Sequence, residues 1–241
     1  MSIRTTFRSA TLLAFISSLL TVGALHATET QLSAIDIVLK PDATMSNRAQ
    51  ESNARLLKDY PQGFALDASH NPHITLLQRY VKTSDLNKVF DAANSVIRKE
   101  RPMRWRLNAF KYYYGKGDKT GLAGIVVKPT ANLLRLQREL IEAVAPYSVP
   151  TGNAAAFVTT PEEPSINKFT IDWVSSYVEK ASGKNFNPHV TTGIGTIAFL
   201  DKLLAEPFQP FSFSPAGVYV YQLGDNGTAR KELTSLGNNP K

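Results

Sequence analysis

Two nearly identical pentapeptides constrain this chain more than any other feature of its sequence. NPHIT runs from Asn71 to Thr75 and NPHVT from Asn187 to Thr191, so the two histidines stand 116 residues apart (189 − 73). Only four histidines occur in the chain, and two of them lie in these copies. A repeat at this distance favours a fold of two related lobes, each contributing one copy to a shared site.

The apolar pattern divides the chain into short strands and helices, because period-two alternation predicts strands and 3.6-residue periodicity predicts helices. Strands are expected at 34–39, 73–81, 103–115, 121–129 and 189–195, with a terminal pair within 211–233. Helices are expected at 43–61, 83–100, 131–144, 169–182 and 196–206. Hairpins dominate the strand pairing, which favours an α+β protein over a parallel α/β sheet.

Residues 1–27 have the layout of a secretory signal peptide. Arg4 and Arg8 precede an uncharged run from Ala10 to Leu25, and cleavage is expected after Ala24 or Ala27. Retention as a membrane anchor is the less favoured alternative, because a span needs roughly 20 apolar residues and this run contains Ser and Thr. A single domain over residues 28–241 is therefore expected in a bacterial periplasm or the medium.

Composition excludes several chemistries. The chain has no cysteine, which rules out a disulfide frame, a thiolate nucleophile, a Cys-based zinc site and a lipidated cysteine. Signal cleavage would leave 25 basic residues (27 − 2) against 20 acidic ones. This surplus mildly favours an anionic partner such as a phosphorylated ligand, and no run of like charges marks a nucleic-acid-binding arm.

The repeated pentapeptides have the residue types of a phosphoryl-transfer site. In a strand, His73 and Thr75 point to one face, roughly 6.5 to 7 Å apart, so an imidazole and a hydroxyl can touch one phosphate. His189 and Thr191 repeat this arrangement. In-line displacement at phosphorus needs a base for the attacking oxygen and an acid for the departing one, and histidine suits both roles near neutral pH.

Three other interpretations compete with this one. A single histidine on a strand is more often packed or capping than catalytic, although two copies in matching context argue against coincidence. A metal site would need a third and usually a fourth ligand, and only His70 remains after processing, so neither a metal nor another cofactor is expected. A non-catalytic periplasmic protein that binds a nucleotide or another phospho-ligand is the remaining alternative.

At these residues the sequence resembles the two-histidine (2H) phosphoesterase superfamily, whose members include LigT-like 2′,5′ RNA ligases and cyclic nucleotide phosphodiesterases. Its two His-x-Ser/Thr-x motifs are matched by HITL at His73 to Leu76 and HVTT at His189 to Thr192. The context KNFNPHVT and the closing VYVYQLGDNGTARKEL are similar to secreted bacterial LigT-like proteins. The resemblance implies a bilobal fold of two antiparallel sheets, with pseudo-twofold symmetry around a central cleft and helices outside.

The resemblance also implies a function. It predicts a metal-independent phosphodiesterase acting on 2′,3′-cyclic phosphate or 2′,5′-linked ribonucleotides, with the catalytic set His73, Thr75, His189 and Thr191. RNA 2′,5′ ligation is a further alternative, although an exported protein would seldom meet tRNA halves. The expected partner is a nucleotide or an RNA end, with neither duplex nucleic acid nor membrane bound, and the protein is expected to be a monomer.

Substrate contacts outside the motifs are also predicted. Arg79 lies six residues beyond His73 and would share its face in a strand without a bulge, where it could meet a second phosphate or simply be a solvated strand end. Stacking on a base, or burial in the core, is expected of four aromatic residues: Phe157, Phe186, Tyr219 and Tyr221. The aperiodic segment 147–166 is either a lid over the site or a spacer.

Overall fold

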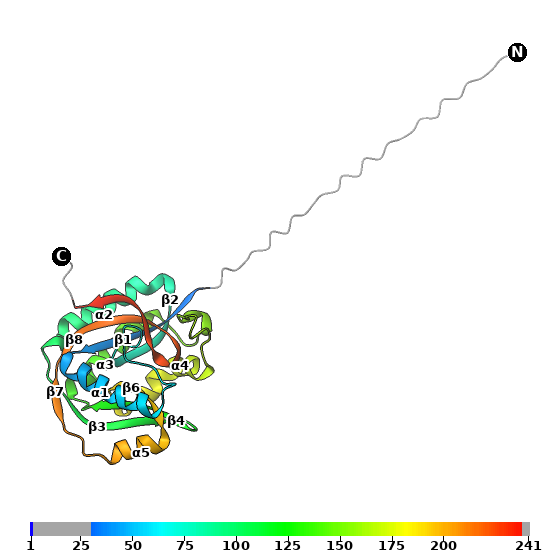
Figure 1. Ribbon diagram of the computed structural model, residues 1–241. Coiled ribbons are helices and arrows are strands. Elements are labelled where there is room, and N and C mark those ends of the chain that lie inside the picture. The colour runs from blue at the N-terminus through cyan, green and yellow to red at the C-terminus, as the bar shows by residue number, and fades with distance from the viewer. Residues whose placement is uncertain (2–29, 238–241) are drawn as a thin grey trace.

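The computed structural model describes Met1 and residues 30–237, which form two antiparallel β-sheets with helices packed on them (Figure 1). Apart from Met1, the predicted signal peptide lies outside the described residues, as do both of its predicted cleavage positions. None of the helices in the described part of the chain is long and apolar enough to cross a bilayer.

The first sheet has five strands in the spatial order β5-β2-β1-β8-β9, and all of its neighbouring strands are antiparallel. Their bounds are β1 Leu32–Pro41, β2 Ile74–Lys82, β5 Ser148–Val149, β8 Pro215–Leu223 and β9 Ala229–Leu236. The second sheet has the order β6-β4-β3-β7, again antiparallel throughout. Its strands are β3 Leu107–Lys116, β4 Thr120–Val127, β6 His189–Thr196 and β7 Phe211–Phe213.

Within residues 30–237, five α-helices cover these sheets: α1 Ala43–Asp59, α2 Leu86–Glu100, α3 Ala131–Val144, α4 Lys168–Ala181 and α5 Ile197–Ala205. Helix α1 follows β1 of the first sheet but packs along β6 of the second, which ties the two halves together. Helices α2 and α3 pack on each other, and α3 and α4 both pack on β2. In Figure 1, β1, β2 and β8 occupy the upper half of the molecule, and β3 and β4 lie below them.

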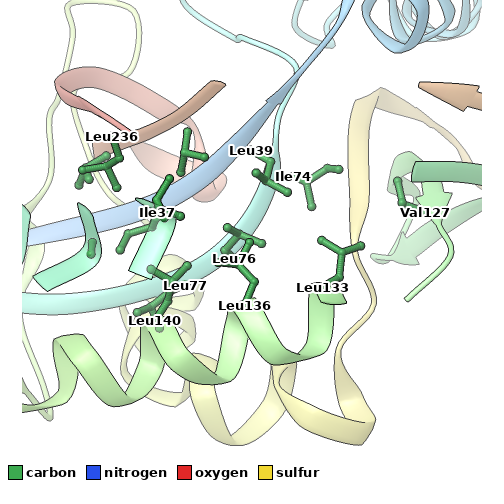
Figure 2. Close-up of a cluster of buried hydrophobic side chains, with 14 of the residues drawn as sticks. Ile37, Leu39, Ile74, Leu76, Leu77, Val127, Leu133, Leu136, Leu140 and Leu236 are labelled. Atoms are coloured by element: carbon green, nitrogen blue, oxygen red, sulfur yellow. The ribbon is translucent and has the colours of Figure 1, made fainter. Parts of the chain in front are cut away.

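The main hydrophobic core joins the outer face of the first sheet to α3 and extends to the second sheet. Figure 2 shows the leucines of α3 next to Leu76 and Leu77 of β2, with Val127 of β4 at the other end of the cluster. The periodic leucines Leu133, Leu136 and Leu140 are fully buried, as their helical spacing predicts.

The predicted fold class, α+β with two antiparallel sheets and helices outside, is confirmed. Two strand boundaries were wrong. Residues Pro102–Arg104 form a 3-10 turn after Arg101 adopts a left-handed φ of 52°, so β3 starts at Leu107. Phe211–Phe213 pairs with β3 in the second sheet as the separate strand β7, whereas β8 and β9 form the terminal pair.

Candidate active site

The two pentapeptides lie on strands of different sheets that meet inside the molecule. His73 immediately precedes β2, and His189 is the first residue of β6. The two strands approach to within 8 Å between Cα atoms although they share no hydrogen-bonded ladder. The charge of His189 is one of the influences that lower the pKa of His73, so the two imidazoles are close enough to interact electrostatically.

Both imidazoles are held in the same way. Nδ1 of His73 lies 2.7 Å from the carbonyl oxygen of Asn71, and Nδ1 of His189 lies 2.7 Å from the carbonyl oxygen of Asn187. A carbonyl oxygen can only accept, so Nδ1 carries the proton and donates it in each ring. Nε2 is therefore the nitrogen left to exchange a proton with a ligand.

Burial controls the protonation of this pair. It is the largest influence on both histidines and lowers the pKa of His73 and of His189, while the bonds to the two carbonyls oppose it. In the free protein both imidazoles are consequently neutral at neutral pH. An anion placed between them would favour the protonated form and raise these pKa values again.

A β-bulge follows the threonine in both motif strands. On β2, Thr75 pairs with Val38 and Leu77 with Ile37, which leaves Leu76 as the extra residue. A bulge inserts one residue and breaks the alternation of faces. Both Leu76 and Leu77 are accordingly buried in the same core.

The second bulge occupies the corresponding position. On β6, Thr191 pairs with Gly124 and Gly193 with Ala123, which leaves Thr192 as the extra residue. Gly193 has a φ of +142°, and a Cβ there would lie 2.8 Å from Asn53 Nδ2, so this residue turns toward α1 and not toward the other motif. The repeat in the sequence is therefore a repeat of backbone geometry as well.

The first motif is attached to a buried carboxyl group. The hydroxyl of Thr75 lies 2.8 Å from Asp36 Oδ2, and Gln78 Nε2 donates to the same oxygen at 3.0 Å. Asp36 is fully buried, and His73 Nε2 lies 3.9 Å from this oxygen. Burial raises the pKa of Asp36 to about 8, although the bonds from Gln78 and Thr75 act against it. The carboxyl is therefore mostly protonated at neutral pH.

The second motif has different neighbours. Gly124 on β4 faces Thr191, and a Cβ at this glycine would lie 3.0 Å from the Val190 carbonyl oxygen and 3.2 Å from His189 Cδ2. The ring centroids of Tyr113 and His189 lie 5.1 Å apart. Glycine therefore provides the room in which the His189 imidazole sits.

Asn53 of α1 connects the two motifs from behind. Its amide nitrogen donates to the Phe64 and Thr192 carbonyl oxygens at 2.9 Å each, and its amide oxygen accepts from Leu66 N at 3.1 Å. Phe64 and Leu66 belong to the loop that leads to His73, and Thr192 is the bulge residue of β6. The buried Asn53 side chain thus holds in place both the loop that precedes the first motif and the bulge that follows Thr191 in the second.

The expected position of Arg79 was wrong. Because of the bulge at Leu76, Gln78 shares the face of Thr75, as their common partner Asp36 demonstrates. Arg79 pairs with Ile35 and points to the opposite face.

The aromatic candidates divide into buried and accessible rings. Phe157 packs edge-on against Tyr80 in a satellite core, and Phe186 lies in the main core, so of the two expected roles the structure shows burial in the core for both rings. Tyr221 is buried, and its hydroxyl donates to Glu232 at 3.2 Å. Tyr219 is half-buried on the same face of β8, the face that carries Asp36 on the neighbouring strand. Of the four rings, Tyr219 remains the accessible one.

Segment 147–166 is fastened along the first sheet. Ser148 and Val149 form β5 beside β2, and Val158 N donates to the Leu223 carbonyl oxygen at 2.8 Å. Glu163 forms an ion pair with Arg230 of β9. The alternatives of a lid or a spacer are thus replaced by a segment packed into the fold.

His70 belongs to the loop before the first motif. Its ring stacks on Phe64 with centroids 4.6 Å apart, and its Nδ1 lies 3.0 Å from the Ser69 hydroxyl. These contacts give His70 a packing role. Within residues 30–237, no group of three or more His, Asp or Glu side chains is arranged to hold a metal ion.

No protein-family model and no curated protein matches the sequence. The crystal structure of TT0787 of Thermus thermophilus is similar to this chain with a TM-score of 0.49 and 14% identity, covering 86% of this chain and 100% of that chain. The crystal structure of E. coli LigT complexed with 3′-AMP has a TM-score of 0.43 and 14% identity, covering 86% of this chain and 99% of that chain. At these values the likeness assigns neither a family nor an activity to this chain.

Sequence reasoning missed three residues around the motifs: Asp36, Gln78 and Asn53. Asp36 could have been found from the sequence, since an acidic residue stands between Ile35 and Ile37 in the otherwise apolar run 34–39. Asn53 could not, because an asparagine in a polar helix is ordinary.

Proposed function

We propose that this protein is a metal-independent phosphodiesterase of the two-histidine phosphoesterase superfamily, acting on 2′,3′-cyclic phosphate or 2′,5′-linked ribonucleotides. The observation that carries the proposal is the matched pair of imidazoles on approaching strands, each with Nδ1 engaged by a backbone carbonyl and Nε2 left for proton exchange. Two such groups meet the requirement of in-line displacement for a base and an acid.

In the proposed reaction, one histidine Nε2 takes a proton from water as the water oxygen bonds to phosphorus. The other histidine, protonated on Nε2 because the bound phosphate anion favours its charged form, gives that proton to the ribose oxygen as the bond between that oxygen and phosphorus breaks. Thr75 and Thr191 donate hydrogen bonds to the phosphoryl oxygens, where negative charge accumulates. Tyr219 is the aromatic side chain proposed to stack on the base.

We extend the proposal to action outside the cytoplasm, on the basis of the charge and hydropathy pattern of residues 1–27. The protein is further proposed to be a monomer. An exported phosphodiesterase would meet nucleotides and RNA ends in the periplasm or the medium.

The test is hydrolysis of the four nucleoside 2′,3′-cyclic monophosphates by the purified protein in EDTA. His73→Gln and His189→Gln should each lower kcat by about 10² or more, the scale of acid–base contributions. His70→Gln is the matched control, because this histidine stacks in a loop outside the pair, and it should stay within about tenfold of the wild type.

Undiminished turnover in both motif variants would refute the assignment of the histidines. Saturable binding of the intact cyclic nucleotides with no product would instead indicate a non-catalytic binding protein. Joining of RNA ends without hydrolysis would indicate a ligase.

A further inference from the structure

The hydroxyl groups of the two motif threonines have different surroundings. Thr75 Oγ1 lies 2.8 Å from Asp36 Oδ2, whereas the Thr191 hydroxyl has no hydrogen-bond partner among the residues that the structure describes. The residue that faces Thr191 is Gly124, which brings no side chain. A hydroxyl has a single proton, so Thr75 cannot donate to a carboxylate and to a phosphoryl oxygen at the same time.

The site around Asp36 disfavours a charged carboxylate. Its Oδ1 is buried without a partner, and an ionised oxygen in that position would lose its hydration with nothing in return. Its Oδ2 has two partners on β2, Thr75 and Gln78. Burial accordingly raises the pKa of this carboxyl to about 8.

Titratable groups reach Asp36 from three sides. His73 Nε2 lies 3.9 Å away, and burial keeps this imidazole neutral at neutral pH. Tyr177 of α4 is buried, and the carboxyl of Asp36 is one of the causes that raise its pKa. Tyr221 of β8 pairs with Asp36, but its hydroxyl is directed to Glu232. None of these neighbours offers a lysine or arginine that would hold the carboxylate in its charged form.

We propose that Asp36 is a positioning residue that acts as a neutral carboxylic acid, donating its proton to Thr75 Oγ1 and thereby freeing the Thr75 proton for a phosphoryl oxygen. The 2.8 Å distance between the two oxygens suits donation in either direction. A protonated Oδ2 keeps a lone pair for Gln78 Nε2, so the second bond is preserved. This inference rests on the proposed function, because it concerns the phosphate bound there.

Ionisation of Asp36 reverses the arrangement. The carboxylate then accepts a hydrogen bond from the Thr75 hydroxyl, so the bound phosphate loses one of its two hydroxyl donors. The Thr191 donor is unaffected, because it has no carboxyl beside it. Phosphate affinity should therefore be full at pH values where Asp36 is protonated and should fall as the pH rises through about 8.

Asp36→Asn separates the two states, since an amide can donate to Thr75 at every pH. The second N–H of the introduced amide would donate to Gln78 Oε1 once the side-chain amide of Gln78 is flipped. In the wild type, Gln78 Oε1 is buried without a hydrogen-bond partner, so the flip gives this atom a partner. The probes are adenosine 2′-monophosphate and adenosine 3′-monophosphate, bound to the full protein in EDTA and measured by isothermal titration calorimetry. The ratio of wild-type to variant Kd should be constant up to pH 7 and rise about tenfold by pH 9.

The ratio of the two Kd values reports the titration of Asp36 alone, because both histidines and the ligand phosphate titrate in both proteins. Thr75→Val is the matched control: without the hydroxyl, exchanging Asp36 for Asn should change Kd by the same factor at pH 7 and pH 9. If Asp36→Asn does not fold, the wild type and Thr75→Val suffice, since the advantage given by the hydroxyl must shrink about tenfold between these pH values. Melting curves establish that each variant is folded.

Two results overturn the inference alone: a ratio independent of pH, or a rise that persists in the Thr75→Val background, which would indicate charge repulsion without the hydroxyl. Failure of every folded variant and of the wild type to bind either nucleotide would overturn the proposed function, and this inference with it.

Discussion

Replacing Asp36 by asparagine should stabilise the folded protein by an amount that grows with pH. Burial raises the pKa of Asp36 from 3.8 to about 8. A group whose pKa is raised by folding stabilises the protein below its unfolded pKa, and that stabilisation is lost as the pH rises toward the folded pKa. Between these limits the folded state holds one proton more than the unfolded state, which gives a slope of about 1.4 kcal/mol per pH unit.

From pH 5 to pH 7, the wild type should consequently lose about 2.7 kcal/mol relative to Asp36→Asn. The assay is urea unfolding of both proteins at pH 5, 6 and 7, followed by circular dichroism. Every other titrating group is present in both proteins, so the difference between the two unfolding free energies reports Asp36 alone. The difference should level off above about pH 8, where the folded carboxyl ionises as well.

Asp67→Asn provides the control of opposite sign. Its side chain accepts from Ser69, and this bond lowers the pKa of Asp67. A carboxyl whose pKa is lowered by folding stabilises the protein above its unfolded pKa, and this stabilisation is lost only as the pH falls below that value. The effect of Asp67→Asn on the unfolding free energy should therefore be the same at pH 5 and pH 7. Parallel pH curves for wild type and Asp36→Asn would mean that Asp36 is ionised in the folded protein, which would remove the basis for its proposed role.

Three further substitutions test the site and its support. Asn53→Ala removes three hydrogen bonds and should lower the unfolding free energy by about 2 to 4 kcal/mol; a urea midpoint unchanged from wild type would contradict this. Gly124→Ala places a Cβ 3.2 Å from His189 Cδ2 and should lower kcat about tenfold or more, whereas Gly115→Ala on the same hairpin, with 3.4 Å to its nearest neighbour, should not. Phe157→Ala should destabilise by about 3 kcal/mol or more and leave KM for the cyclic nucleotides unchanged, so a large rise in KM would restore its role in binding.

Hydrophobic periodicity predicted the order of helices and strands because that signal is local. The helix at 131–144 was predicted to the residue, since its leucines repeat at helical spacing. The structure adds that Thr130 caps this helix by accepting a bond from Leu133 N. The antiparallel pairing of β3 and β4 could also be predicted, because the Gly- and Lys-rich segment GKGDKTG from Gly115 to Gly121 is typical of a turn between two antiparallel strands.

The bulge in β2 could not be predicted from the sequence. In strict alternation Leu76 would share the face of Ile74, whereas the adjacent Leu77 would share the opposite face with Thr75. Only the pairing with β1 determines that both are buried, and this pairing moves Arg79 away from the motif face. For Phe157 the sequence left burial in the core and stacking on a base as alternatives, because an aperiodic segment gives no indication of which of its side chains enters a core.

The two bulges explain how one local sequence serves two lobes. In each motif the strand alternates through histidine and threonine and then inserts a residue, Leu76 or Thr192, which packs into the interior. The alternation presents the imidazole and the hydroxyl on one face, and the side chain of the bulge residue that follows is buried in the interior. Backbone symmetry of this kind supplies two equivalent pairs of groups.

In-line displacement requires two groups that act differently at the same moment, one taking a proton and one giving it. The strands themselves cannot provide that difference, because both histidines are held by the same carbonyl contact at the same 2.7 Å distance. The difference lies in the adjacent strands, where β1 places the carboxyl of Asp36 beside the first motif and β4 places Gly124 beside the second. Exchanging the base and acid roles between His73 and His189 should therefore not be energetically neutral, and the variants at Asp36 and Gly124 change the two halves of the site separately.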